Sequence, residues 1–282
     1  MMFKALVPLA VLLLATAASA AGTGPEIAYV KSGTYSEIYL VDPDGTRLRL
    51  LYRSKQRMRI FTLDMKPTGG ELAFEEVGNT ASTATLKILR YDNAGSLQET
   101  KALPVCRILS LDYHPSGSDL LYHDSCAGAR RLDTNAMTSS PLGVPAGTNK
   151  VVWRNASQLI YNRSTAAASE VLVAPLSNPT STTVVGEVRL ASSMDVSTSG
   201  NWLLVDPVDF GALSLFNMAS GTEQKDWQIG HHGRFSPNDL QVAYVTGYDV
   251  RGQYIMIRNV SGPGAPFRLA GKGVFGPLDW RN

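Results

Sequence analysis

The sequence has few of the residues on which most enzyme and metal sites depend. It holds 2 cysteines and 4 histidines in 282 residues, and charged residues make up 18% of the chain. It contains neither the G-x-S-x-G turn of a serine hydrolase nor the H-E-x-x-H helix of a zinc protease. The formal net charge of +2 gives no overall field that would recruit nucleic acid. We therefore expect a protein without a catalytic site, a metal, a cofactor or a nucleic-acid partner.

Long hydrophobic runs are missing except at the N-terminus. The first segment, MMFKALVPLAVLLLATAASA, carries Lys4, an apolar stretch and the small-residue pattern Ala18-Ser19-Ala20. This is the form of a secretory signal peptide, and its apolar run is shorter than the roughly 20 residues of a membrane helix. The sequence predicts that residues 1–20 are removed near Ala20. The mature chain is then expected in the periplasm or outside the cell, without a membrane span, the alternative being an uncleaved anchor.

The rest of the chain repeats a strand, a tight turn and a second strand. These units span residues 61–76, 109–124, 150–164, 192–207 and 232–246, with the turn residues Pro67, Pro115, Asn155, Thr198 and Pro237 at intervals of 39 to 48 residues. A third run with alternating apolar residues follows each unit, and then a short fourth run such as 182–185 or 266–270. Alternation broken by turn residues predicts four antiparallel strands per repeat. A repeat of this length is typical of a propeller blade.

The two ends of the chain supply the parts of one more repeat. The segment 26–31 reads as a second strand that lacks its first strand, and the chain ends on a first strand, 278–282, that lacks its partner. Pairing these segments would close a ring and remove two exposed sheet edges. The sequence therefore predicts an all-β fold, a six-bladed β-propeller of four-stranded antiparallel blades that occupies residues 21–282 as a single domain and is closed by its terminal strands.

The repeats resemble those of the TolB-type propeller family. The resemblance lies in the turn Ser236-Pro237-Asn238-Asp239 before Val242-Ala243-Tyr244, and in the segment IYLVDPDG at 38–45. TolB carries a further α/β domain before its propeller, for which there is no room between Ala21 and Glu26. The resemblance therefore implies the propeller and its binding function. We expect a monomeric chain that binds a protein or peptide partner of the cell envelope.

The two cysteines are placed for a disulfide. In a hairpin centred on Ser116, Cys106 and Cys126 lie opposite each other near the ends of the two strands. Two exported thiols without a C-x-x-C spacing form a structural bridge more often than a reactive pair. The sequence predicts a Cys106–Cys126 disulfide in the third blade.

The connections between blades carry a run of basic and titratable residues. If strands run from inner to outer within each blade, as the resemblance implies, these connections converge on one mouth of the central channel. The candidate binding residues there are Arg57, Arg59, Arg107, Lys150, Arg189, His231, His232 and Lys272. A ring of positive charge at a funnel concentrates anions. We expect this mouth to capture a protein, a peptide or an anionic ligand.

The positions of the four histidines distinguish a binding site from a catalytic site in this funnel. His114 and His123 lie at the ends of strands and are expected on the surface. His231 and His232 are consecutive, and consecutive side chains of a regular strand point to opposite faces, so no metal site is predicted from them. A lyase or hydrolase in the same funnel remains the alternative, and it would require a histidine paired with a carboxylate or a metal.

Overall fold

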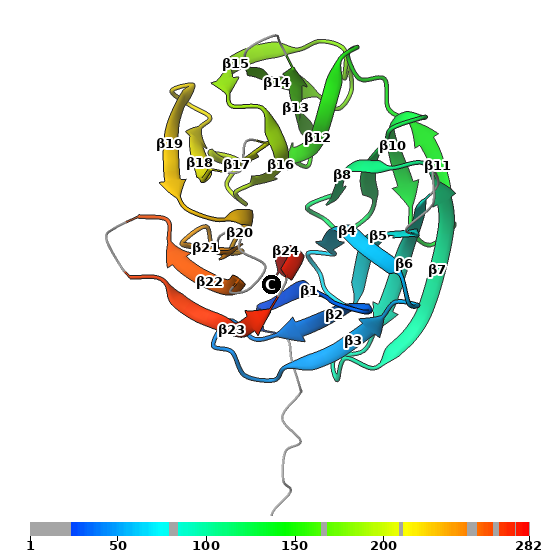
Figure 1. The fold of residues 1–282 in the computed structure, drawn as a ribbon. Helices are drawn as coiled ribbons and strands as arrows, with labels where there is room; N and C mark the ends of the chain where they lie inside the picture. The colour runs from blue at the N-terminus through cyan, green and yellow to red at the C-terminus, as the bar shows by residue number, and fades with distance from the viewer. Residues whose placement is uncertain are drawn as a thin grey trace, which may run out of the picture.

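The structure is a computed structural model that describes residues 24–78, 84–164, 168–208, 211–246, 253–261, 265–273 and 275–281. Six four-stranded antiparallel sheets surround a central axis, and the chain's last strand lies close to that axis (Figure 1). The predicted signal peptide lies outside the described residues. No helix among the described residues has the length and apolar character of a membrane span.

The six blades follow one another along the chain, as predicted. The first blade contains β24 (Phe275–Arg281), β1 (Glu26–Ser32), β2 (Ser36–Val41) and β3 (Arg49–Arg53). The second contains β4 (Met58–Met65), β5 (Glu71–Gly78), β6 (Ala84–Tyr91) and β7 (Leu97–Val105). The third contains β8 (Ile108–Tyr113), β9 (Leu120–Asp124), β10 (Gly128–Asp133) and β11 (Thr138–Pro141).

The other three blades repeat this order. The fourth contains β12 (Thr148–Asn155), β13 (Gln158–Ser164), β14 (Ser169–Pro175) and β15 (Thr183–Val188). The fifth contains β16 (Ala191–Val196), β17 (Trp202–Pro207), β18 (Leu213–Asn217) and β19 (Thr222–Gln228). The sixth contains β20 (His231–Phe235), β21 (Gln241–Val245), β22 (Gln253–Asn259) and β23 (Phe267–Gly273).

The ring closes as the repeat pattern predicts. β1 pairs with β24, with Ile27 opposite Trp280 and Ala28 opposite Asp279. Glu26 is buried and accepts charged hydrogen bonds from Arg281 and Arg49. Because the two termini share one sheet, neither leaves an inner edge free to pair with another chain.

The hydrophobic core is divided into wedges between neighbouring blades. One cluster joins the first and second blades and includes Leu40, Leu63 and Phe74. Another joins the sixth and first blades through residues such as Tyr29 and Ile257. Four further clusters occupy the remaining interfaces. The alternating residues of each sheet are therefore buried on both faces, which explains why so many strands are apolar at successive positions.

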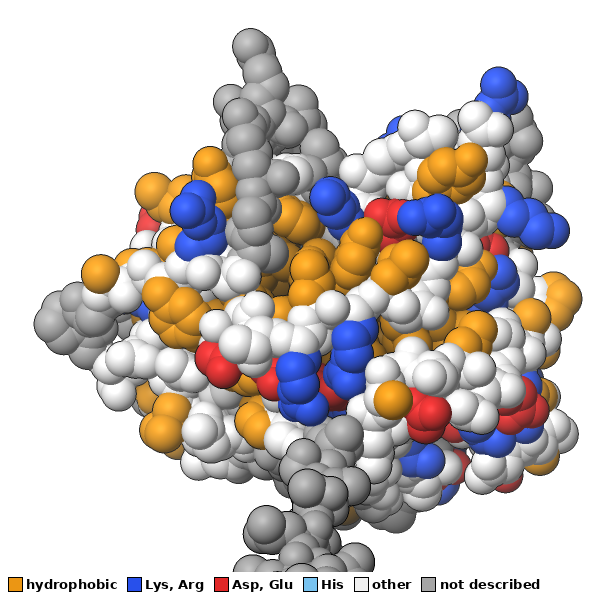
Figure 2. Space-filling view, turned by 90° about the horizontal axis from the view of Figure 1, so that it is seen from below, with side chains coloured by type: hydrophobic (Ala, Val, Ile, Leu, Met, Phe, Trp, Pro, Cys, Tyr) orange, Lys and Arg blue, Asp and Glu red, His pale blue; other side chains and the backbone are white. Residues whose placement is uncertain are grey.

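The propeller has two faces that differ in their turns. We call the face where each inner strand begins the connection face, because the connection from the preceding blade arrives there. We call the other the hairpin face, because the turn between the first two strands of each blade lies there. The edge of the molecule that carries the first blade shows hydrophobic side chains in its middle with Lys and Arg side chains around them (Figure 2).

The predicted disulfide is present. Cys106 and Cys126 are bonded with a Cα–Cα distance of 5.9 Å, just before β8 and just after β9. The carboxylate of Asp124 accepts the backbone N–H of Cys126 at 2.7 Å and that of Cys106 at 3.1 Å. These hydrogen bonds place the two cysteines side by side at the beginning of the third blade.

Candidate functional site

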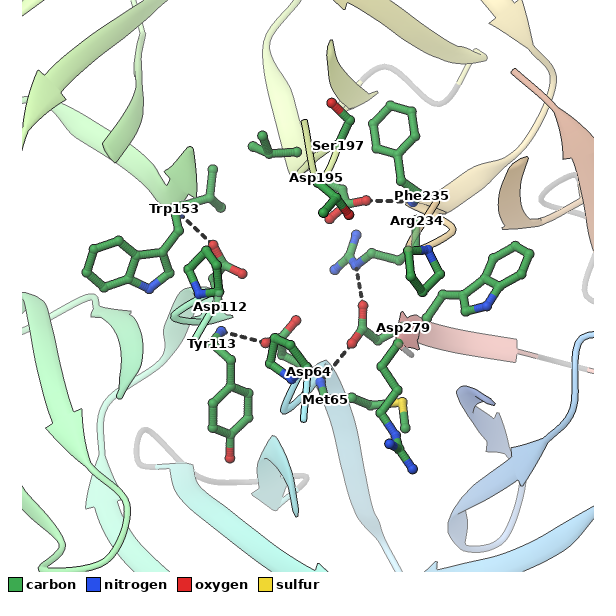
Figure 3. A pocket seen from close by; sticks show the side chains of 18 of the residues that line it. Asp64, Met65, Asp112, Tyr113, Trp153, Asp195, Ser197, Arg234, Phe235 and Asp279 are labelled. Atoms are coloured by element: carbon green, nitrogen blue, oxygen red, sulfur yellow. Dashed lines mark hydrogen bonds and ion pairs between the residues drawn. The ribbon is translucent and has the colours of Figure 1, made fainter. Parts of the chain in front are cut away.

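A cavity opens on the axis at the hairpin face (Figure 3). It has a volume of about 230 Å³. The ends of the inner strands and the turns that follow them form its wall. Its wall carries four aspartates and three arginines, Asp64, Asp112, Asp195, Asp279, Arg154, Arg234 and Arg281, with the hydroxyl residues Ser197 and Thr198 and the aromatic residues Tyr113, Trp153, Phe235 and Trp280. None of the eight predicted binding residues is among the described residues that line this cavity.

Four aspartates in the cavity wall connect neighbouring blades. Each sits at the same place in its inner strand and accepts a backbone N–H from the next blade. The four bonds are Met65 N to Asp279 Oδ2 at 2.7 Å, Tyr113 N to Asp64 Oδ2 at 2.6 Å, Trp153 N to Asp112 Oδ2 at 2.5 Å and Phe235 N to Asp195 Oδ2 at 2.6 Å. These carboxylates therefore hold the inner strands of the propeller together.

The remaining two positions of this ring carry Val152 and Arg234. The guanidinium group of Arg234 reaches between the carboxylates of Asp195 and Asp279 (Figure 3). Its Nε lies 3.6 Å from Asp279 Oδ1. One buried cation thus offsets part of the charge of four acidic side chains.

The aspartates are difficult to ionise in this setting. Burial raises the pKa of Asp195 to about 6, against the attraction of Arg234. Burial and the neighbouring carboxylates raise the pKa of Asp279 to about 7, although Arg234 again opposes the shift. Burial, together with nearby carboxylates, also raises the pKa values of Asp64 and Asp112. Part of the ring is consequently protonated below neutral pH.

The predicted basic residues lie on the connection face, at the opposite end of the channel. Arg57 and Arg59 are exposed, and Arg57 has a left-handed backbone with φ of 66°. Arg107 forms an ion pair with Glu75 at 3.0 Å. Arg189 forms one with Asp226 at 2.9 Å. Lys272 lies in β23, and its side chain is outside the described part of the structure.

Lys150 is partly buried and, unlike Arg107 and Arg189, forms no salt bridge within the described residues. Its ammonium group donates a hydrogen bond to the main-chain carbonyl of Leu109 in the preceding blade. Burial lowers the pKa of Lys150 to about 8, although Glu75 and Asp206 attract its charge. Its charge therefore has no direct carboxylate partner among the described residues.

The histidines depart from the sequence-based expectation. His114 and His123 are buried rather than on the surface, and His114 packs its ring edge to face on Trp153 at 4.6 Å. The rings of His231 and His232 are in contact at 4.6 Å instead of pointing to opposite faces. The reason is a break in strand pairing at this point, where His232 adopts a φ of 53°.

His232 is not arranged as a base. Its Nδ1 lies 4.0 Å from Asp206. Burial and the nearby charges of His231 and Arg234 lower the pKa of His232, so its ring is neutral. Among the described residues, one group of three side chains that could bind a metal lies close together, namely Cys106, Asp124 and Cys126. Its two sulfur atoms are already joined in the disulfide.

All six inner strands are irregular near their beginning, on the connection face. The pairing with the second strand shifts between Ile60 and Thr62, and similar shifts occur in β8, β12, β16, β20 and β24. A β-bulge inserts extra backbone and redirects a side chain. We call the residues at five of these bulges the bulge ring: Phe61, Leu109, Asn149, Ser192 and His232.

Sequence reasoning missed the aspartate ring and, apart from His232, the bulge ring. The aspartates do leave a signal, because each lies three residues before the turn position, as Asp64 does before Pro67 and Asp112 before Pro115. Their backbone contacts across blades have no counterpart in the sequence. The bulges leave no comparable pattern, since they depend on how each inner strand is paired.

Comparisons with known proteins agree with the architecture. The structure of TolB from Acinetobacter baumannii aligns with a TM-score of 0.74 and 14% identity over 90% of this chain. The chain covers 66% of that TolB's length. A putative TolB from Agrobacterium tumefaciens aligns with a TM-score of 0.59 and 13% identity, covering 88% of this chain and 91% of that one.

An enzyme shares the fold as well. An oligogalacturonate lyase from Vibrio parahaemolyticus aligns with a TM-score of 0.51 and 14% identity, covering 81% of this chain and 75% of the lyase. No protein-family model matches the sequence, and no curated protein matches it either. Because these structural identities are low, they establish the fold alone. The chain is a six-bladed β-propeller similar to the propellers of TolB and oligogalacturonate lyase.

Proposed function

We propose that this chain is an exported, non-catalytic binding protein that captures a protein, a peptide or another anionic ligand at the mouth of its channel on the connection face. The observation that carries the proposal is the combination of exposed cations and exposed apolar side chains around this mouth. Soluble proteins rarely gather large apolar side chains at one place on their surface without a use for them.

Six of the exposed large hydrophobic residues lie on the connection face. Phe61 is 46% exposed and Ile229 is 70% exposed. Tyr35, Leu109, Leu190 and Val208 complete the set. Leu190 and Val208 are direct neighbours, since the backbone N–H of Val208 donates to the carbonyl of Leu190 at 2.7 Å. Counting each connection with the blade that it leads into, these side chains come from five different blades, so a partner that covers the mouth would contact several of them at once.

Unpaired cations lie beside this apolar surface. Lys55, Arg57 and Arg59 are exposed and form no ion pair within the described residues. Arg107 lies over the ring of Phe61 at 4.6 Å while it is paired with Glu75. Exposed charges of one sign steer a partner of opposite charge, and the apolar groups then supply area to bury.

The alternative is a lyase or hydrolase with its site in the channel, as the similarity to oligogalacturonate lyase suggests. The four cavity aspartates each hold a backbone N–H of the neighbouring blade. This use supports a structural role for them rather than acid–base chemistry. His232 also supports binding over catalysis, because its lowered pKa makes it a weak base and its Nδ1 lies 4.0 Å from the carboxylate of Asp206. Release of unsaturated products from oligogalacturonate by the purified protein would contradict the non-catalytic proposal.

The proposal of export rests on the predicted signal peptide and on the disulfide. Structural disulfides persist in oxidising compartments such as the periplasm or the cell exterior. The Cys106–Cys126 bond supports such a location. Fractionation of cells that express the full chain tests it, since cytoplasmic recovery of the uncut protein would contradict export.

Charge reversal tests the binding proposal. The variant with Arg57→Glu and Arg59→Glu is compared with the wild type for crosslinked partners in a cell-envelope extract. Lys225→Glu with Arg268→Glu is the matched control, because both residues are exposed on outer strands away from the mouth. We expect partners to be lost only in the first variant, and more strongly at low salt. Equal recovery by both variants and the wild type would count against the proposal.

A further inference from the structure

The bulge ring divides the connection-face mouth into two chemically different halves. In the second and third blades the bulged residues are Phe61 and Leu109. In the fourth, fifth and sixth blades they are Asn149, Ser192 and His232. One half of the mouth is therefore apolar and the other half polar. Bulges that occur at the same place in successive blades are features of design rather than defects, and they often re-aim side chains at a site.

The apolar half is open to solvent. Phe61 is 46% exposed and Leu109 is 36% exposed. The guanidinium group of Arg107 covers part of the Phe61 ring with its Cζ at 4.6 Å from the ring centre. Arg107 is held there by its ion pair with Glu75. The result is a fixed apolar surface with a positive border, which fits an apolar side chain next to an acidic one.

Lys150 stands where the two halves meet. It follows the bulged Asn149, and its ammonium group reaches back to the carbonyl of Leu109, in the apolar half. It has no salt bridge within the described residues. Its cross-strand neighbour Asn162 is fully buried, and neither the nitrogen nor the oxygen of that amide has a hydrogen-bond partner. Buried polar groups normally have hydrogen-bond partners, and the described part of the chain supplies none to this amide.

We infer that the bulge ring recognises one segment of an acidic protein partner, with an apolar side chain of that segment on Phe61 and Leu109 and a neighbouring carboxylate on Lys150. This inference rests on the proposed function and adds the chemistry of the partner. The carboxylate gives the partly buried ammonium group the direct ion-pair partner that it lacks within the described residues. The apolar contact buries the two side chains that the bulges expose. Lys150 and Phe61 are thus the residues that determine specificity, whereas Arg57 and Arg59 attract the partner from a distance.

Surface plasmon resonance with a defined probe tests this assignment. The probe is a synthetic peptide of alternating Glu and Leu, compared with its Gln–Leu and Glu–Ser counterparts. We expect Lys150→Met to lower the affinity of the Glu–Leu peptide about tenfold, and Lys150→Arg to retain it, because the pair depends on charge. We expect Phe61→Ser to lower the affinity by a similar factor, on the order of tenfold. Leu240→Ser is the matched control, since Leu240 is 62% exposed in a turn of the hairpin face.

The outcomes separate this inference from the proposed function. Unchanged affinity in Lys150→Met and Phe61→Ser, together with weaker binding by the Arg57/Arg59 reversal, would overturn the inference and leave the proposed function standing. Equal binding by the wild type and all three variants would overturn both. No binding of the Glu–Leu peptide by the wild type would overturn the inference, while the comparison in the envelope extract decides the proposed function. Tighter binding of phosphatidylglycerol vesicles than of the peptide, with the same loss in Lys150→Met, would show a membrane rather than a protein as the occupant and would also overturn the inference.

Discussion

Replacing Asp195 by asparagine would measure how much the buried negative charge of this aspartate lowers the free energy of unfolding. Asp195 Oδ2 accepts the N–H of Phe235 at 2.6 Å and so joins the fifth blade to the sixth. The oxygen of an asparagine amide accepts the same hydrogen bond. The substitution therefore removes the negative charge and retains the contact between blades.

The expected size follows from the pKa of this carboxyl group. Burial raises the pKa of Asp195 from 3.8 to about 6. Between these two values the folded protein holds a proton that the unfolded chain has released, so the group stabilises the fold at low pH. That contribution is lost as the pH rises through about 6. A shift of about 2 units corresponds to ~3 kcal/mol, an upper bound here because the cavity is open at the hairpin face.

Urea unfolding of the wild type and Asp195→Asn, at about pH 8 and about pH 4 with the disulfide intact, gives the free energies of unfolding. We expect the variant to be more stable than the wild type at about pH 8, by up to ~3 kcal/mol. The difference should almost vanish at about pH 4, because the wild-type carboxyl group is then protonated in the folded state.

Asp195→Ala supplies the comparison, because alanine removes the acceptor as well as the charge. It leaves the N–H of Phe235 without its partner, which costs about 1–3 kcal/mol relative to the asparagine variant. The reasoning is refuted if Asp195→Asn is less stable than the wild type at about pH 8. An identical pH dependence in the two proteins would refute it as well.

Three further predictions concern the bonds that hold the ring together. Changing both Cys106 and Cys126 to serine should lower the free energy of unfolding by about 3 kcal/mol, measured in urea without reductant, and two free thiols in the mass of the unreduced wild type would contradict the assignment. Deleting residues 275–281 should abolish the single cooperative thermal transition, because the first blade loses its inner strand, and an unchanged transition by circular dichroism would contradict ring closure. Tyr113→Phe should cost about 1–2 kcal/mol because the hydroxyl donates to buried Glu71 at 3.0 Å, and a neutral effect on urea unfolding would show that this bond contributes nothing.

The architecture could be predicted because its determinants are local and repeated. Alternating residues and turn prolines such as Pro67 and Pro115 define the strands, and the strand-like ends of the chain define the closing blade. The Cys106–Cys126 pairing followed from hairpin register alone. These features need no knowledge of how one blade sits against another.

The details of the channel depend on contacts between blades, and there the sequence was less informative. His123 was expected on the surface, but it is buried at a blade interface. His231 and His232 were expected on opposite faces, and a bulge brings their rings together. Asp64 is apparent in the repeat, yet its partner, the N–H of Tyr113, belongs to the next blade. In each of these cases the environment of the side chain depends on strand irregularities or on contacts with the next blade, which the sequence pattern does not contain.

The pairing of β1 with β24 also sets the order in which the molecule can be completed. Glu26 and Arg281, which meet in that sheet, are 255 positions apart in the sequence. Without the 7-residue strand β24, β1 is an open edge and the circle has a gap. A contact between such distant segments carries a large loop-closure entropy, so joining β1 to β24 is the most costly pairing of the fold to initiate.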